Sequence, residues 1–329
     1  RLAQIPKQQA AAFMRHARYY IDLLQGLEAQ FLIDVGAQAV VQRDLDNIRI
    51  AWRWSIEQCD LALLAKGTES LYYFYRLAGL YGEAIQLFEA AARPVGELVS
   101  VSAMDAEAVA LLARLLYHTA EFYRRLDKVA IGERLAQEAL KLGKRLANPT
   151  LQGWAYHELA RLAYARSNAL AMHTLAEAGC KQARQAGAPY LIAECLNDLG
   201  IAVSVCHGPL IALPHFHEAL TLLQSGTNLP LEAFVLVNLG FFSLANCQYQ
   251  AAHTYLQRGV TLQHLLQDRG GRLPPLIHLC NLYLALGNGQ GAQRAYAEAL
   301  RLAPTIGNAR WESQLQASYG RWQHLNGDL

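Results

Sequence analysis

The chain has 329 residues, of which 53% are hydrophobic and 17% are charged, and its formal net charge is +2. This composition excludes a disordered chain, and the small net charge gives no support for nucleic acid or an acidic membrane as a partner. Residues 1–165 hold 19 Lys and Arg with 18 Asp and Glu, whereas residues 166–329 hold 10 and 9, so the second half should present a more neutral surface that suits apolar or uncharged ligands.

Residues 1–60 form a segment of their own, which we predict to be an N-terminal helical junction or capping hairpin. Its first motif is Arg15-His16-Ala17-Arg18-Tyr19-Tyr20. Its second is Asp44-Leu45-Asp46-Asn47-Ile48-Arg49, which runs into Ala51-Trp52-Arg53-Trp54. Apolar spacing predicts a helix that buries Leu45, Ile48, Trp52 and Ile56 along one face. Asp44 or Asp46 is positioned to cap the start of this helix or a following turn.

These two motifs resemble the segment that joins the nucleotide-binding and winged-helix part of bacterial STAND-type ATPases to their C-terminal repeats. The resemblance implies that the rest of the chain is the sensor arm of such a regulator. The alternative is a capping hairpin with no ATPase attached. Because the chain begins at Arg1 rather than Met, we expect it to be a piece of a longer protein.

Beyond residue 60 the sequence repeats itself every 40 residues. The clearest sign is a row of small residues at this spacing: Ala120, Ala160, Gly200, Gly240, Cys280 and Gly320. A fixed period in this range is typical of a solenoid of stacked units. Small residues are expected where helices cross closely, because a larger side chain there would force the helices apart.

Each period contains two amphipathic helices, and no segment has the pattern of a strand. Turn-forming residues separate the helices: Asn148-Pro149, Asn168, Gly187, Asn228, Gly270-Gly271 with Pro274-Pro275, and Pro304 with Gly307. We therefore predict an all-α, right-handed α-solenoid of about 15 helices. Its expected repeats are 61–98, 105–146, 150–187, 189–226, 229–268 and 273–304, followed by a final helix at 308–326. A longer connection near Pro94 is expected to shift the first repeat out of register.

The repeats resemble the tetratricopeptide repeat (TPR). Three stretches carry the resemblance: Leu276, Leu279, Cys280, Tyr283, Ala292, Tyr296, Ala299, Leu300 and Pro304; Leu196, Leu199, Gly200, Ala212, Phe216 and Ala219; and an earlier copy with Leu71, Tyr72, Tyr75, Ala84, Phe88 and Ala91. The unit is about six residues longer than the usual repeat of that family, which implies longer helices. Met172 stands where the family has a close-packing Ala.

No catalytic, metal or cofactor site is expected. The six cysteines form no CxxC pair, and no histidines occur at a metal-ligand spacing, so we expect free thiols in a reducing cytoplasm. Gly287-Asn288-Gly289-Gln290-Gly291 lies between two predicted helices rather than after a strand, which makes it a turn and not a phosphate-binding loop. We expect a protein that is not an enzyme.

The first helix of each pair should line a concave groove. The residues of this helix that point into the groove are the candidate ligand-binding residues. They are Arg114, Tyr117, His118, Glu121, Trp154, His157, Arg161, Tyr164, Asn197, Asp198, Phe234, Asn238, Phe241, His278 and Asn281. A side-chain amide both donates and accepts hydrogen bonds, so the asparagines could pair with the backbone of an extended peptide. They could equally bond to a neighbouring helix. The aromatic residues could form side-chain pockets or belong to the core.

The sequence therefore predicts a recognition domain whose groove binds a peptide or protein, in a STAND-type signalling ATPase or transcriptional regulator. Its upstream ATPase domain would be a further partner. Two alternatives remain open: a free-standing scaffold for protein complexes, and a receptor for a small-molecule inducer.

Overall fold

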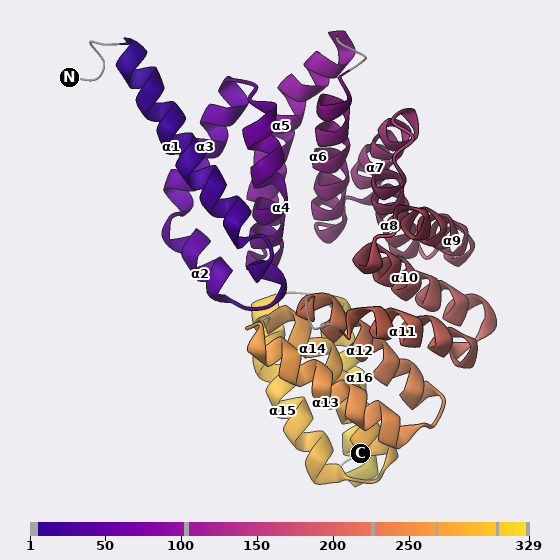
Figure 1. Cartoon of the computed structure of the whole chain (residues 1–329). Helices are drawn as coiled ribbons and strands as arrows, with labels where there is room; N and C mark the ends of the chain where they lie inside the picture. The colour runs from indigo at the N-terminus through magenta and orange to yellow at the C-terminus, as the bar shows by residue number, and fades with distance from the viewer. Residues whose placement is uncertain (1–5, 102–104, 225–227, 268, 307–308, 327–329) are drawn as a thin grey trace. The chain divides into compact units, whose positions relative to one another are not determined.

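The computed structural model describes residues 6–101, 105–224, 228–267, 269–306 and 309–326. These residues form sixteen α-helices and one short 3₁₀ helix, with no strand among them, which confirms the predicted all-α fold (Figure 1). The first 60 residues supply α1 (Pro6–Leu27), η2 (Gln30–Leu32), α2 (Gly36–Arg43) and α3 (Leu45–Glu57). They are followed by helical hairpins, as expected for an α-solenoid.

The hairpins pair successive helices, with a single helix at the end. They are α4 (Leu61–Ala78) with α5 (Tyr81–Val101), α6 (Ala106–Arg125) with α7 (Val129–Arg145), α8 (Pro149–Ala165) with α9 (Ala169–Ala186), α10 (Pro189–His207) with α11 (Pro209–Leu223), α12 (Leu229–Ala245) with α13 (Tyr249–Leu265), and α14 (Arg269–Ala285) with α15 (Gly289–Ile306), followed by α16 (Ala309–Asn326). Residues 1–198 form one compact unit and residues 199–329 a second. We call them unit 1 and unit 2.

The two N-terminal motifs dock onto the first hairpin. His16 Nε2 and Asn47 Oδ1 lie 3.5 Å apart, which brings the motifs together. Arg49 donates two hydrogen bonds to Glu83 of α5, at 2.6 and 2.7 Å, and Trp52 Nε1 donates to a backbone carbonyl of the same helix at 3.3 Å. The conspicuous residues of the second motif therefore fasten α3 to the first repeat.

The predicted buried face of α3 is present. Leu45, Ile48 and Trp52 are buried and Ile56 is half-buried. Asp44 occupies the N-cap position, but its side chain accepts from Arg43 instead of capping the helix.

The 40-residue period is visible in the backbone. Left-handed conformations recur within hairpins at Asp127, Ser167, Cys247 and Gly287, and between hairpins at Ala147, Gly187 and Gln267. Asparagine side chains cap α8, α9 and α12: Asn148, Asn168 and Asn228 each accept from a backbone N–H three residues later, at 3.0 to 3.2 Å. At Ala147-Asn148 and Ser167-Asn168 a left-handed residue thus ends one helix and the following asparagine caps the next.

The small residues of the repeat mark close contacts within hairpins. A Cβ added at Gly240 would lie 2.4 Å from Leu256 Cγ, and one added at Gly200 would lie 2.7 Å from the Phe216 ring. Real Cβ atoms do not approach other heavy atoms so closely. The repeated glycine therefore makes room for a large side chain of the second helix.

Several expected breakers lie inside helices. Pro94 is within α5, which continues to Val101, so no loop near Pro94 shifts the register as predicted. Gly270-Gly271 and Pro274-Pro275 fall within α14, and Pro304 falls within α15. At Pro94, whose neighbours Ala91 and Val95 are buried, packing outweighs the local cost of proline, as it often does for propensity. Gly307 lies outside the described residues.

By its length and its apolar composition, helix α10 could cross a membrane. However, 61% of its apolar window is buried against the rest of the protein. This burial is that of a core helix.

Candidate functional site

We use the term first-helix face for the surface that the first helices of the hairpins form within one unit. In unit 1 these are α4, α6, α8 and α10 up to Asp198, and in unit 2 they are α12, α14 and α16. Successive first helices contact one another, as α4 does α6, α6 does α8, α12 does α14, and α14 does α16. All fifteen candidate ligand-binding residues lie on these helices.

The first-helix face of unit 1 is centred on the buried carboxylate of Glu121. It accepts a 2.5 Å hydrogen bond from the Tyr72 hydroxyl and a 2.7 Å bond from Arg125. Burial alone would raise the pKa of the Glu121 carboxyl, but the nearby arginines outweigh it and hold that pKa well below its usual range. Glu121 is therefore ionised and joins α4 to α6.

The network of charges continues from α6 through α8 to α10. Arg124 Nε donates to Glu158 at 2.7 Å, and His157 Nδ1 lies 2.7 Å from Asp198 Oδ2. Burial raises the pKa of Glu158, and the charge of Glu121 adds to this effect. Burial would lower the pKa of His157, but the Asp198 carboxylate outweighs it and raises that pKa above its ordinary value. Each first helix of unit 1 is thus tied to the next by a charged pair.

Aromatic rings complete this face. The rings of Tyr117 and Trp154 stack with centroids 6.1 Å apart and an interplanar angle of 15°, while His118 stacks on Tyr72 at 3.9 Å. Burial raises the pKa of the Tyr117 hydroxyl well above its ordinary value.

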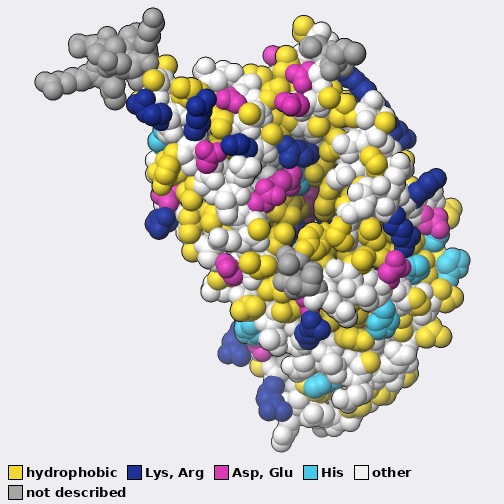
Figure 2. All heavy atoms as spheres, viewed as in Figure 1, with side chains coloured by type: hydrophobic (Ala, Val, Ile, Leu, Met, Phe, Trp, Pro, Cys, Tyr) yellow, Lys and Arg dark blue, Asp and Glu magenta, His cyan; other side chains and the backbone are white. Residues whose placement is uncertain are grey.

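On the side of the molecule shown in Figure 2, acidic and basic side chains lie beside one another over α4 and α5 and form no patch of one sign.

The candidates of unit 1 differ in their access to solvent. Tyr117, His118, Glu121, His157, Asn197 and Asp198 are buried, Arg114, Trp154 and Arg161 are half-buried, and Tyr164 is exposed. Asn197 has no exposed surface, so its amide lies in the interior rather than at the groove as predicted. Arg114, Trp154, Arg161 and Tyr164 are the members of this set that a ligand can reach.

The sequence analysis missed the contribution of α4. Glu69 lies 3.0 Å from His118 Nε2, and Arg76 and Tyr72 face Glu121. The partners on α4 and α6 are 49 residues apart, as Tyr72 is from Glu121, instead of the 40 that relate later repeats. The 40-residue spacing therefore could not find them, although the aromatic cluster at Tyr72 and Tyr73 was a visible signal.

The first-helix face of unit 2 has a different character. Phe234, Asn238 and Asn281 are half-buried, and Phe241 is 41% exposed. The Phe241 ring lies 4.8 Å from the ring of buried His278. Burial lowers the pKa of His278 to about 4, so its imidazole is neutral near pH 7. This face offers apolar rings, amides and a neutral imidazole where unit 1 offers ionised groups.

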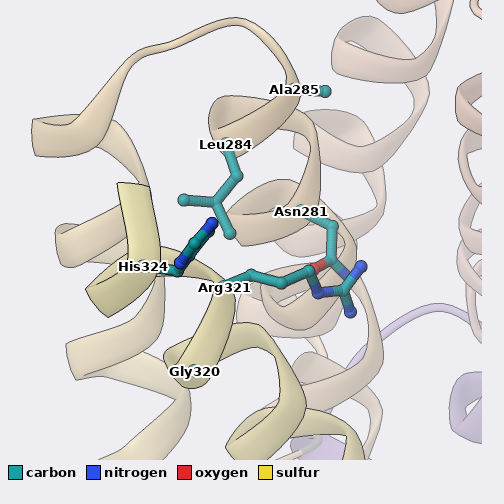
Figure 3. Close-up of a pocket in the computed structure, with 6 residues that line it drawn as sticks. All are labelled: Asn281, Leu284, Ala285, Gly320, Arg321 and His324. Carbon is teal, nitrogen blue, oxygen red and sulfur yellow. The ribbon is translucent and has the colours of Figure 1, made fainter. Parts of the chain in front are cut away.

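A pocket of about 490 Å³ opens on the same face, between α14 and α16 (Figure 3). It is lined by Asn281, Leu284, Ala285, Gly320, Arg321 and His324. Asn281 is held in place because Ser318 Oγ donates a 2.9 Å hydrogen bond to its Oδ1. Of the fifteen candidates, Asn281 is the one that lines this pocket.

The structure also bears on metal binding and on the reactivity of the cysteines. In the part of the chain that the structure describes, no group of three or more His, Cys, Asp or Glu residues could hold a metal ion. All six cysteines are free thiols, and burial raises the pKa of Cys280 to about 11, which disfavours the reactive thiolate.

The fold is that of tetratricopeptide-repeat proteins. A Rap protein complexed with competence and sporulation factor is 15% identical and matches 97% of this chain and 98% of its own, with a TM-score of 0.55. A signal transduction ATPase with numerous domains (STAND) with a tetratricopeptide repeat sensor, from Pyrococcus horikoshii, is 15% identical and matches 97% of this chain with 49% of its own, at a TM-score of 0.57.

A subunit of the APC/C hetero-tetramer Cut9–Hcn1 is 17% identical and matches 94% of this chain with 54% of its own, also at a TM-score of 0.57. No protein-family model matches the sequence, and neither does any curated protein. At these identities the likeness concerns the fold.

Proposed function

We propose that this chain is a non-catalytic recognition domain that binds a peptide or protein segment along its first-helix faces. The fold supports a role in protein interaction, since the matched structures include a Rap protein with a bound factor and a complex of APC/C subunits. Stacked helical hairpins present extended surfaces of this kind. Of the fifteen residues predicted for the groove, those that keep accessible surface are the candidates for direct contact with a ligand: Arg114, Trp154, Arg161, Tyr164, Phe234, Asn238, Phe241 and Asn281.

The observation that carries the proposal is the surface around Phe241. This ring is 41% exposed and lies beside the half-buried amide of Asn238 and the neutral His278, on a helix that is otherwise closely packed. An exposed aromatic ring on such a face can hold an apolar side chain of a peptide. Such a ring is a typical anchor of a binding surface.

The test uses peptides selected from a random displayed library against the whole chain. An enriched peptide should bind Phe241→Ala at least about tenfold more weakly than the unaltered protein, which corresponds to about 1.4 kcal/mol. Leu265→Ala is the matched control, since Leu265 is also an exposed apolar residue but lies on the second helix α13. If every enriched peptide binds both variants equally, the first-helix face of unit 2 is not the binding surface.

We propose further that the chain is the sensor arm of a STAND-type regulator in a bacterial cytoplasm. Two observations support this: the motifs of residues 15–20 and 44–54, and the similarity to a STAND protein whose tetratricopeptide repeats form its sensor. The free state of all six thiols agrees with a reducing compartment. The gene should encode a phosphate-binding GxxxxGK[ST] loop and a winged helix upstream of Arg1. A start codon a few residues before Arg1 would instead favour the scaffold or the small-molecule receptor.

A further inference from the structure

We propose that the pocket between α14 and α16 binds a carboxylate attached to an aliphatic body. This proposal rests on the recognition function above and specifies the chemistry of one end of the first-helix face in unit 2. Asn281 and Arg321 are 40 residues apart and thus occupy the same position in successive repeats, as do Leu284 and His324. The pocket therefore lies between equivalent faces of α14 and α16.

The first reason for the proposal is a positive charge without a matching carboxylate in the pocket. None of the six lining residues is acidic. Arg321 lines the pocket and is exposed, its Nε donates to the backbone carbonyl of Ala317 at 3.3 Å, and its guanidinium lies beside Asn281 (Figure 3). A guanidinium in this setting favours an oxyanion, to which it can donate two parallel hydrogen bonds.

The second reason is a comparison with the arginines of unit 1. Arg114, Arg124, Arg125 and Arg161 each lie within 4.0 Å of a carboxylate of the protein itself. Glu121 supplies one of these carboxylates, and it occupies the repeat position that Asn281 and Arg321 hold in unit 2. In the pocket, a ligand carboxylate would take the place that Glu121 fills in unit 1.

The third reason is the rest of the lining. Because Asn281 Oδ1 is engaged by Ser318, its Nδ2 hydrogens are oriented to donate, and His324 provides a further ring nitrogen. Leu284 and Ala285 are apolar and contribute the wall on the other side. A volume of about 490 Å³ is in the range of small-molecule sites and accommodates several carbon atoms beside the carboxylate.

The experiment measures binding of two pairs of probes by calorimetry and by the indole NMR signal of neighbouring Trp322. One pair is hexanoate and hexanamide, which differ in charge. The other is the blocked peptides acetyl-Leu-Glu-Leu-amide and acetyl-Leu-Gln-Leu-amide. We expect the charged member of at least one pair to bind at least about tenfold more tightly than its neutral partner, because charge-assisted hydrogen bonds are about twice as strong as neutral ones. The pair that responds tells a free aliphatic acid from an acidic side chain of a peptide.

Two sets of variants assign the binding to this pocket. Arg321→Gln should abolish the preference for the charged probe, whereas Arg301→Gln should retain it. Arg301 is a close control because it is an exposed residue of α15 whose Nε makes the same 3.3 Å bond to the carbonyl four residues earlier. Ala285→Glu, which adds a carboxylate to the lining of the pocket, should prevent binding, and Ala285→Gln, which adds the same bulk without the charge, should permit it.

Equal binding of charged and neutral probes, equal losses in Arg321→Gln and Arg301→Gln, or no binding of either charged probe would overturn the proposal. The recognition function is tested separately by the response of selected peptides to Phe241→Ala. If selected peptides bind Phe241→Ala more weakly while the charged probes bind Arg321→Gln as tightly as the unaltered protein, the carboxylate site is rejected and the recognition function is not.

Discussion

At equivalent repeat positions, unit 1 carries ionised side chains that pair with one another, whereas unit 2 carries apolar and amide side chains and the exposed Arg321. One such position holds Glu121 and Arg161 in unit 1, and Phe241 and Asn281 in unit 2. In unit 1 the charged residues pair across successive first helices and are largely buried. In unit 2 the corresponding residues keep accessible surface. The comparison teaches that residues at the same repeat position can join successive first helices through ion pairs, or can leave the first-helix face accessible to a ligand.

The packing inside the hairpins differs in the same way. In unit 1 the small residues Ala120 and Ala136, sixteen positions apart, belong to one buried cluster. At the corresponding positions of unit 2, Gly240 faces Leu256 and Gly200 faces Phe216. These two hairpins of unit 2 thus pair a glycine with a large residue, whereas the hairpin of α6 and α7 in unit 1 pairs two alanines.

The largest effect is expected from removing the central carboxylate of unit 1. Glu121→Ala would leave the surrounding arginines and the Tyr72 hydroxyl without their partner in a buried site, and should lower the free energy of unfolding by about 3–5 kcal/mol. Asn281→Ala, at the same repeat position in unit 2, should cost about 1 kcal/mol, since it removes one hydrogen bond from Ser318. Urea unfolding of both variants measures the difference. Equal losses would mean that the charges of unit 1 do not hold its helices together.

Two of the buried histidines, His157 in unit 1 and His278 in unit 2, should give the units opposite pH dependence. The folded pKa of His157 lies above the unfolded value of about 6.5, so its contribution to stability is present below that pH and is lost as the pH rises through the folded pKa. The folded pKa of His278 is about 4, so its contribution is present above about 6.5 and is lost as the pH falls toward 4.

For His278 the free energy of unfolding should fall by up to about 3 kcal/mol as the pH is lowered. For His157 the free energy of unfolding should change with pH in the opposite direction. Unfolding of the original protein is compared with His157→Asn above pH 6.5 and with His278→Asn below it. Each substitution should flatten the pH profile in its own range. If His278→Asn leaves the acidic limb unchanged, burial is not what governs that histidine.

The period of the sequence was enough to predict the helices, because it records contacts that recur in every repeat. Gly200 and Gly240 leave room for a large side chain of the next helix, and the asparagines cap helix starts. Both roles depend on local geometry that the sequence records. Local rules failed at Pro94, Pro274 and Pro304, where the helix continues through the proline. A proline is a reliable end signal only where nothing else holds the helix.

The site was less predictable because burial depends on the neighbours of a helix and not on its own pattern. Asn197 and Asn281 occupy nearby places in their repeats and look alike in the sequence. The first is fully buried, while the second lines a pocket. The partnership of Tyr72 with Glu121 also stayed hidden, since it crosses 49 residues where the period is 40. The residues of the pocket on α16, in contrast, follow directly from the 40-residue spacing.

The packing comparison is sharpened by two glycines at the same repeat position in unit 2. Gly240→Ala places a Cβ 2.4 Å from Leu256 and should cost about 1–3 kcal/mol. Gly320→Ala meets nothing within 4 Å and should stabilise α16 by about 0.5–1 kcal/mol, because alanine favours a helix. Thermal unfolding of both variants reports the sign. In the background Leu256→Ala, which recreates the small pair of unit 1, Gly240→Ala should lose most of its cost.

The smallest effect concerns the turns that both units share. Ala147 adopts a left-handed conformation with φ of 47°, which costs an L-residue about 1–2 kcal/mol relative to glycine. Ala147→Gly should therefore stabilise unit 1 by up to about 1 kcal/mol after the greater freedom of glycine in the unfolded chain is counted. Gly187, forty residues later in the equivalent turn, has φ of 63°, and Gly187→Ala should be destabilising by a similar amount. Urea midpoints of the two variants should move in opposite directions. If both move the same way, the turns are not equivalent, and the 40-residue register does not extend to the backbone between hairpins.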